Sequence, residues 1–245
     1  LHVHVGVDSG DKAVMICDRI MRHLPTLLAV SCNSPWWNNR VSGILSHRSK
    51  IMEGLPTAWL PSLMRNWSEY VWLVNHLIDT GFINSIRDIW WDIRPHHNFG
   101  TVEVRVCDMP GNLNDTMTIV ALVHCLVRAL SNDFDQGAYQ HDCHPMMVRQ
   151  NKWRAARYGI DAQLVESFTH ELTSARSTIT QLAERLRPTG EQLECTEYLD
   201  RVGDLAQSPC WASKQLKWLD ETRDPAAVIR KMTDQSRLSP ARDKS

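Results

Sequence analysis

Residues 89–108 read IWWDIRPHHNFGTVEVRVCD, and this stretch decides the fold. It predicts two strands joined by a turn through residues 95–100. In the second strand apolar residues alternate with others, so one face should be buried and the other should carry a site. The apolar face consists of Val102, Val104 and Val106, and the opposite face of Thr101, Glu103, Arg105 and Cys107.

The same alternation marks the start of the chain. Residues 2–7, HVHVGV, place two histidines and a glycine on one face and three valines on the other, as in a half-buried strand. Asp8 or Ser9 can cap a following helix with apolar residues at helical spacing, and Pro25 should close that helix. Because the two polar faces should meet at one site, we expect residues 2–7 and 101–107 to lie in one antiparallel sheet.

The rest of the chain is predicted to be mainly helical, which gives an α+β class. Residues 31–43 are rich in turn formers and aromatic residues, which indicates an ordered functional loop. A helix is expected over residues 63–80, and its inner face is expected to carry Trp67, Tyr70, Val71, Val74 and Leu77. After Asn114 no strand is evident. The helices there are expected over residues 115–131, 146–158, 161–186 and 190–206, with shorter pieces to 236 and a polar tail over 237–245.

The composition is that of an average globular protein, with 43% hydrophobic and 22% charged residues among 245. The formal net charge of −1 gives no attraction to nucleic acid or to anionic lipid. Seven cysteines without a CxxC pair favour a reduced, cytoplasmic setting. No uninterrupted apolar run reaches the roughly 18 residues that span a bilayer, so no membrane is implied. The first residue is Leu1 rather than Met, which predicts a fragment of a longer protein.

Histidines and a carboxylate on one polar face suggest a divalent metal site. Mg²⁺ or Mn²⁺ would accept such ligands, although the His-x-His pattern of His2 and His4 fits Zn²⁺ equally well. Glu103 and Arg105 can also be interpreted as a simple surface ion pair. Arg94 adds to a segment that carries more charge than a structural hairpin needs, which favours a site for phosphate or carboxylate.

Six ordered blocks of the sequence resemble the glutamate-cysteine ligase type 2 (carboxylate-amine ligase) family. The blocks are residues 2–7 (HVHVGV), 33–37 (NSPWW), 90–96 (WWDIRPH), 100–108 (GTVEVRVCD) and 151–159 (NKWRAARYG), together with Arg40, Gly43, Ser46 and Arg48. They cover residues 1 to about 160 densely, whereas the remainder is similar to the family only in its helical character.

The resemblance implies a glutamine-synthetase-like fold, in which an open antiparallel sheet covered by helices holds ATP, divalent metals and a glutamate-like carboxylate. Family members resemble enzymes that phosphorylate a carboxylate and let an amine such as cysteine displace the phosphate. Residues 1–245 would then be the C-terminal part of a single catalytic domain, with strands and active-site loops in 1–160 and a helical region over 161–236. The implied cofactors are ATP and Mg²⁺ or Mn²⁺, the implied partners are small-molecule carboxylates and amines, and a homo-oligomer is allowed.

Site residues carry over from the family at matching positions. His2 and Glu103 resemble ligands of one metal, and His4 would lie near the nucleotide. Arg105 resembles a contact to carboxylate or phosphate and, with Arg94, would act in catalysis. The remaining expected binding residues are Asn33, Ser34, Arg40 and Arg48 in the loop, and Arg154 and Arg157. The last two belong to a basic run with Arg149 and Lys152, which could also be a simply solvated helix face.

The sequence also departs from the family. Val41 stands where the substrate loop usually has an acid, which leaves the substrate open. Trp59 stands where a small residue is commoner, and His97 where proline is commoner. The family's first strand, whose glutamates bind the other metal and the nucleotide, is absent from these residues. The activity of this part of the protein alone is therefore open.

Two other functions fit parts of the sequence. A His-x-His pattern followed by scattered histidines is also how zinc amide hydrolases begin, but their barrel needs a strand-helix alternation that the helical last hundred residues do not offer. A non-catalytic binding or assembly protein would keep the sheet without turnover. Val41 and the absent strand favour that alternative.

Overall fold

The computed structural model describes residues 1–138, 143–166 and 169–237, and it has the predicted α+β class. The strands are β1 (Val3–Gly6), β2 (Trp36–Trp37), β3 (Arg40–Val41), β4 (Ala58–Trp59), β5 (Trp90–Trp91), β6 (Ile93–His96), β7 (Thr101–Val104), β8 (Gln163–Val165) and β9 (Leu172–Ser174). The α-helices are α1 (Gly10–Ile20), α2 (Leu24–Ser31), α3 (His47–Glu53), α4 (Trp67–Asp79), α5 (Leu113–Asp135), α6 (Pro145–Tyr158), α7 (Ala175–Gln192), α8 (Thr196–Gln207), α9 (Trp211–Thr222) and α10 (Pro225–Ser236). Short 3-10 turns are η1 (Met21–His23), η2 (Ile86–Asp88), η3 (His97–Phe99) and η4 (Gly159–Asp161).

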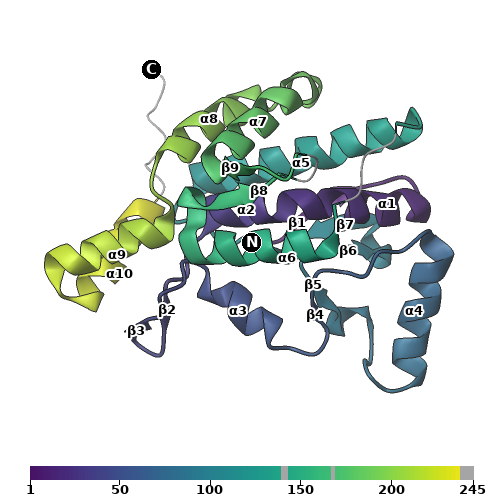
Figure 1. Cartoon of the computed structure of the whole chain (residues 1–245), viewed down its shortest axis with the longest axis horizontal. Coiled ribbons are helices and arrows are strands. Elements are labelled where there is room, and N and C mark those ends of the chain that lie inside the picture. The colour runs from purple at the N-terminus through teal and green to yellow at the C-terminus, as the bar shows by residue number, and fades with distance from the viewer. Residues whose placement is uncertain (139–142, 167–168, 238–245) are drawn as a thin grey trace.

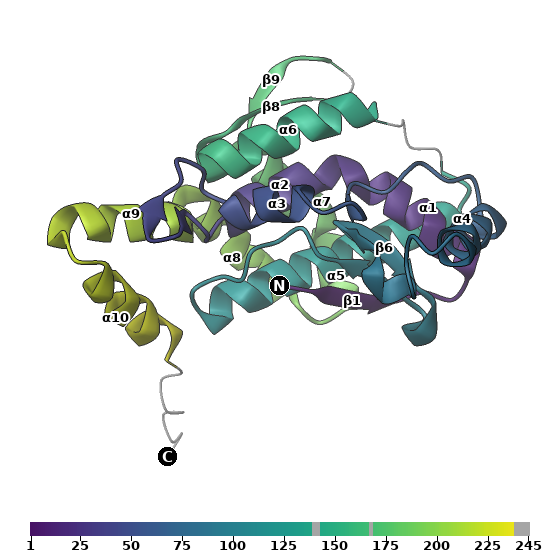
Figure 2. The same cartoon turned by 90° about the horizontal axis from the view of Figure 1, so that it is seen from below.

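The helices α1 and α2 run through the middle of the molecule. Figure 2 shows β1 and β6 on one side of them and α6 with the β8–β9 hairpin on the other. The helices α5, α7 and α8 pack together beside α1, whereas α9 and α10 pack on each other and project at one end (Figure 1). The sheet with its predicted site thus lies on the opposite side of the central helices from α6.

The main sheet confirms that residues 2–7 pair with the strand that begins at Thr101. β7 lies between β1 and β6, and both neighbours run antiparallel to it. The register places His4 opposite Glu103 and Glu103 opposite Arg94. The apolar face, buried in the main core with α1 and α5, consists of Val3, Val5, Ile93, Val102 and Val104.

The predicted alternation stops where β7 ends, at Val104. Beyond it the backbone N–H of Arg105 donates to the carbonyl of Asp92 at 2.7 Å. Val106 and Cys107 are both buried in the core, each 1% exposed. Cys107 therefore does not lie on the polar face as predicted, because a period of two holds only within the strand and β7 ends at Val104.

Ser9 begins α1 as predicted, and its hydroxyl accepts a hydrogen bond from the backbone N–H of Lys12 at 3.1 Å. The end of this helix differs from the prediction. α1 ends at Ile20, and Pro25 stands in the first turn of α2 instead of closing α1. The first turn of a helix tolerates proline, because backbone N–H groups have no acceptor within the helix there and proline has no N–H.

The helix expected over residues 63–80 is confirmed as α4. It begins after the cap Asn66, whose side chain accepts from the backbone N–H of Glu69 at 2.9 Å. Tyr70 and Val74 are buried, but Val71 is 36% exposed and does not belong to the inner face as expected.

The C-terminal part is mostly helical, but the helix expected over residues 161–186 begins only at Ala175, and the expectation of no further strand is wrong. β8 and β9 form an antiparallel hairpin there. The side-chain amide of Asn151 on α6 holds it by donating to the carbonyl of Val165 at 2.9 Å and accepting from its N–H at 2.8 Å. Apart from Arg237, the polar tail predicted over 237–245 lies outside the described residues.

One described helix, α5, is long and apolar enough to cross a membrane by length and composition alone. More than half of its apolar window is buried, and the helix packs against α1, α7 and α8. Core helices of globular proteins pass the same test.

Candidate active site

The carboxylate of Glu103 lies at the centre of the polar face of the sheet, with its side chain 3% exposed. Its Oε2 atom accepts a hydrogen bond from Arg94 Nε at 2.7 Å. Its Oε1 atom lies 3.1 Å from His2 Nδ1, 3.5 Å from His4 Nε2 and 3.7 Å from Arg105 Nε. The structure therefore brings together five residues that the sequence singled out, from three strand segments.

Arg94 is fixed as firmly as the carboxylate that it holds. Its Nη1 atom donates to the carbonyls of Ile86 at 2.6 Å and Ile89 at 2.5 Å, and its side chain is 7% exposed. These carbonyls belong to η2 and to the residue that follows it. Because Arg94 is already bound on several sides, its role in this structure is to hold Glu103 in place.

Glu103 is held in its ionised form. Burial by itself raises the pKa of Glu103, but hydrogen bonds from His2 and Arg94 and the charges of Arg94 and Arg105 outweigh it, and the pKa falls to about 2. A carboxylate that is anionic at neutral pH and faces histidine nitrogens can accept a divalent cation.

Arg105 keeps hydrogen-bonding capacity for a ligand. Its side chain is 9% exposed, and its Nε atom is buried without a hydrogen-bond partner. Its Nη1 atom donates to the carbonyl of Ile89 at a long 3.4 Å, and the guanidinium lies 5.7 Å from the ring centroid of Trp90. Burial, and then the positive charge of Arg94, lower the pKa of Arg105. An incoming anion would satisfy both the orphan donor and the excess positive charge.

A second row of polar groups follows along the same face. His4 Nδ1 and Thr101 Oγ1 lie 3.0 Å apart, and His96 stands opposite Thr101 in the register. The ring of His96 stacks on Phe99 at 4.4 Å, and its buried Nδ1 atom has no hydrogen-bond partner. Burial, and then the charge of Arg94, lower the pKa of His96, so this imidazole is neutral at neutral pH.

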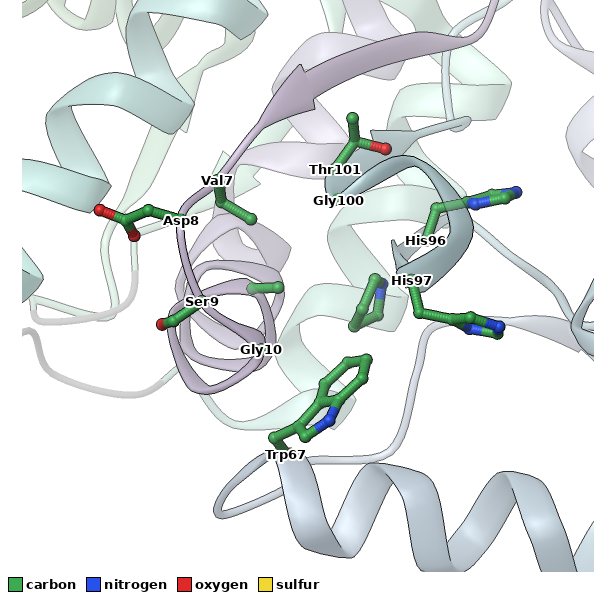
Figure 3. Close-up of a pocket in the computed structure, with 11 residues that line it drawn as sticks. Val7, Asp8, Ser9, Gly10, Trp67, His96, His97, Gly100 and Thr101 are labelled. Carbon is green, nitrogen blue, oxygen red and sulfur yellow. The ribbon is translucent and has the colours of Figure 1, made fainter.

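A pocket of about 280 Å³ opens beside this second row (Figure 3). Thr101 lies on one side of it, and Trp67, from the start of α4, lies on the other. The indole of Trp67 covers Gly10 so closely that a Cβ there would meet it at 2.4 Å. In Figure 3 the carboxylate of Asp8 points away from Trp67 and Thr101. The pocket thus offers an aromatic wall and the first turn of α1.

Asp108 organises the predicted substrate loop; the sequence places it in the same charged segment as Arg94, Glu103 and Arg105, but it was not among the expected site residues. Its Oδ2 atom accepts from the backbone N–H of Asn33 at 2.9 Å and from the hydroxyl of Ser34 at 2.7 Å, and Oδ1 accepts from the hydroxyl of Ser46 at 3.1 Å. Arg48 lies 3.6 Å from the same carboxylate and donates to the carbonyl of Arg105 at 2.9 Å. Asn33, Ser34 and Arg48 therefore support the backbone that leads to Arg105.

The other three predicted binding residues lie apart from Glu103. Arg40 is exposed in the β2–β3 hairpin. Arg154 donates to the carbonyl of Gln163 at 2.9 Å and so supports β8. Arg157 is exposed and lies 5.7 Å from the ring centroid of Tyr158.

Lys152, by contrast, is 2% exposed although it belongs to the basic run that could have been a solvated face. Its Nζ atom pairs with Asp92 and lies 3.1 Å from Glu53 Oε1. Its burial could have been found from spacing, because Val148 and Ala155, four residues before and three after it, are apolar and lie on the same helix face. This buried triad was missed.

Glu103 and the histidines fit part of a metal site. Among residues 1–138, 143–166 and 169–237, no group of three or more His, Cys, Asp or Glu is arranged to hold a metal ion. Mg²⁺, however, usually takes one or two carboxylates together with water and substrate phosphates. Glu103 and His2 therefore suit a metal ion that is also bound by a phosphorylated ligand.

The chain belongs to glutamate-cysteine ligase family 2, whose family model matches residues 1–232. Curated relatives carry the name "Putative glutamate--cysteine ligase 2". The one from Gloeobacter violaceus is 38% identical over 229 residues, which cover 94% of this chain and 62% of the relative. A relative from Frankia casuarinae, with the suffix 2-1, is 42% identical over 199 residues, or 81% of this chain and 52% of the relative. The one from Mycobacterium tuberculosis is 36% identical over 217 residues, or 89% and 58%.

The chain thus spans between about half and three fifths of the length of these curated relatives.

Proposed function

We propose that residues 1–245 are the C-terminal part of the catalytic domain of an ATP-dependent carboxylate-amine ligase. The enzyme phosphorylates a glutamate-like carboxylate in the cytoplasm and transfers the acyl group to an amine such as cysteine. The three-stranded sheet would be part of a larger, glutamine-synthetase-like open sheet. The observation that carries this proposal is the ionised Glu103 carboxylate, which is held between Arg94, two histidines and Arg105.

The proposed metal ligands are His2 and Glu103. A bound Mg²⁺ or Mn²⁺ would neutralise phosphate charge during phosphoryl transfer. Arg94 keeps Glu103 oriented, since its two backbone acceptors leave it little freedom. No nucleophilic side chain is required, because the substrate carboxylate attacks the terminal phosphate and the amine later displaces that phosphate.

Arg105 is proposed to bind the reacting carboxylate or the phosphate that it receives. Its buried Nε donor and its planar fork suit two oxygens of one anion. Arg48 and the Asp108 network hold the backbone on which Arg105 stands. Asn33, Ser34 and Arg48 would therefore act in positioning, and Arg40, Arg154 and Arg157 would meet substrate only at the edge of the site.

The pocket beside Thr101 is proposed to take a flat, neutral part of the nucleotide. Thr101 links the pocket to His4 through the 3.0 Å contact, so a phosphate chain near Glu103 and a base against Trp67 would lie on one continuous surface. The neutral imidazole of His96 can accept or donate a hydrogen bond at its buried Nδ1 atom without adding charge.

The two alternative functions make different demands on the structure. The amide-hydrolase barrel needs parallel strands alternating with helices, whereas the described main sheet is antiparallel. A non-catalytic relative would keep the same sheet, so only turnover separates it from a ligase.

ADP release by the full-length protein tests the proposal. With glutamate, cysteine and Mg²⁺ present, we expect steady ADP formation that stops when glutamate or Mg²⁺ is omitted and slows strongly without the amine. A protein that forms no ADP under any of these conditions, or forms it equally well without a carboxylate, does not have the proposed function.

A further inference from the structure

A second pocket, of about 350 Å³, lies where α6 passes α3 and β4. Its charged lining residues are Lys50, Glu53, Arg149 and Lys152, and the indole of Trp59 also lines it. It lies outside the Glu103 cluster, and the proposed chemistry has not used it.

Trp59 stands in this pocket in a strained backbone conformation. Its φ angle is 103°, a region that bulky residues rarely adopt. Two contacts hold it there: its indole N–H donates to the carbonyl of Glu53 at 2.6 Å, and its own carbonyl accepts from the N–H of Asp92 at 2.8 Å. Strain that the surroundings maintain in this way marks functional positions.

The pocket has an excess of positive charge. Glu53 pairs with Lys50 at 2.8 Å and with Lys152 at 3.1 Å, and Lys152 also pairs with Asp92. The guanidinium of Arg149 lies 4.6 Å from the ring centroid of Trp59. No hydrogen bond or ion pair from a described residue engages Arg149, so three cations face two carboxylates.

Stacking on Trp59 prepares Arg149 for an anion. A guanidinium that lies over an indole keeps its N–H groups at the rim, where they match the two oxygens of a carboxylate. The stack also restricts a long side chain that is otherwise free, so less conformational entropy is lost when a ligand binds.

This pocket adjoins the proposed reaction site through Asp92. The side chain of Asp92 pairs with Lys152 in the pocket, while its backbone carbonyl accepts the N–H of Arg105 at 2.7 Å. One residue therefore contacts both Lys152 in the pocket and the backbone of Arg105 in the proposed reaction site, and this contact connects the two.

From this arrangement we infer that Trp59 and Arg149 bind the carboxylate of the amine substrate, so that α-amino acids are preferred over simple amines as acceptors. The inference rests on the proposed ligase function and adds a specificity pocket to it. The metal and Arg105 would bind the carboxylate that is phosphorylated. The acceptor carries a second carboxylate, which needs its own cation, and Arg149 supplies one without a competing partner.

The test compares two acceptors that differ only in this carboxylate, using full-length wild-type protein and the variant Arg149→Ala. ADP release is measured with glutamate, ATP and Mg²⁺ and with cysteine, its decarboxylated analogue cysteamine, or hydroxylamine as the amine. We expect Arg149→Ala to raise KM for cysteine roughly ten- to a hundredfold, as expected for a lost charge-assisted pair, with little change in kcat. KM for cysteamine and turnover with hydroxylamine should stay unchanged.

Two controls separate the outcomes. Arg187→Ala removes an exposed arginine on α7 whose pairing partners lie on α7 and α8, and it should leave all three amines unaffected. If Arg149→Ala keeps the wild-type ratio of cysteine to cysteamine while wild type turns over, the specificity pocket is wrong and the ligase function stands. If wild type forms no ADP with any of the amines, the proposed function fails and the inference with it.

Discussion

Replacing Glu103 by glutamine should weaken the fold as well as the site. The substitution keeps the shape of the side chain but removes the charge that faces Arg94, Arg105 and the histidines. Two buried guanidinium groups would then lack their shared counterion. Removal of one partner from a buried ion cluster typically costs about 3–5 kcal/mol.

The pKa of Glu103 gives a second measure of this loss. The pKa is lowered from the ordinary value of 4.5 to about 2, which corresponds to about 3 kcal/mol of stabilisation of the ionised form. Because the folded-state pKa is the lower one, this stability is present above about pH 4.5 and disappears as the pH falls through about 2. This contribution is similar in size to the cost of removing one partner from a buried ion cluster.

Urea unfolding of wild type and Glu103→Gln at several pH values checks both points. We expect the variant to be less stable by about 3 kcal/mol at neutral pH, and the difference to shrink steadily below about pH 4 as wild type protonates the same group. Equal stability at neutral pH, or a difference that does not change down to about pH 3, would refute the idea that Glu103 is an ionised anchor.

Three further predictions follow from single side chains. Arg105→Lys should fold normally but lose most ADP release, because lysine keeps the charge without the fork that holds two oxygens. A fall in kcat/KM that corresponds to no more than about 1 kcal/mol would show that Arg105 does not hold two oxygens of the reacting anion. Lys152→Met should lower the free energy of unfolding by about 3 kcal/mol in urea, since Glu53 and Asp92 would lose their shared cation, and an unchanged midpoint would argue against this triad. Ser9→Ala should cost about 1 kcal/mol in the same assay through loss of the α1 cap, while Ser9→Asp should cost less.

The sequence predicted those strands and caps that depend on residues close together in the chain. The alternation in residues 2–7 and 101–107 predicted two half-buried strands that meet at a shared polar face, and the structure pairs them as β1 and β7, although β7 ends at Val104. Ser9 was predictable because a cap is a contact between a side chain and a backbone N–H three residues later. The cluster around Glu103 followed from the same alternation and from the family resemblance.

Features that depend on distant contacts were missed. The β8–β9 hairpin has strands of only three residues, and Asn151 on another element satisfies its backbone. In the sequence Lys152 is one more cation of a basic run. Its pairing with Glu53 and Asp92, which lie far from it along the chain, is seen only in the structure. Cys107 follows the strand period in sequence but lies beyond the point where the strand ends.

An oxygen-transfer measurement tests the ligase mechanism most directly. Full-length protein would be given glutamate labelled with ¹⁸O in its carboxylates, together with ATP, Mg²⁺ and cysteine, and the released phosphate would be analysed by mass spectrometry. If the carboxylate attacks the terminal phosphate and the amine later displaces that phosphate, each phosphate must carry one oxygen from glutamate. Released phosphate without ¹⁸O, at a rate of ADP formation that depends on glutamate, would contradict the account.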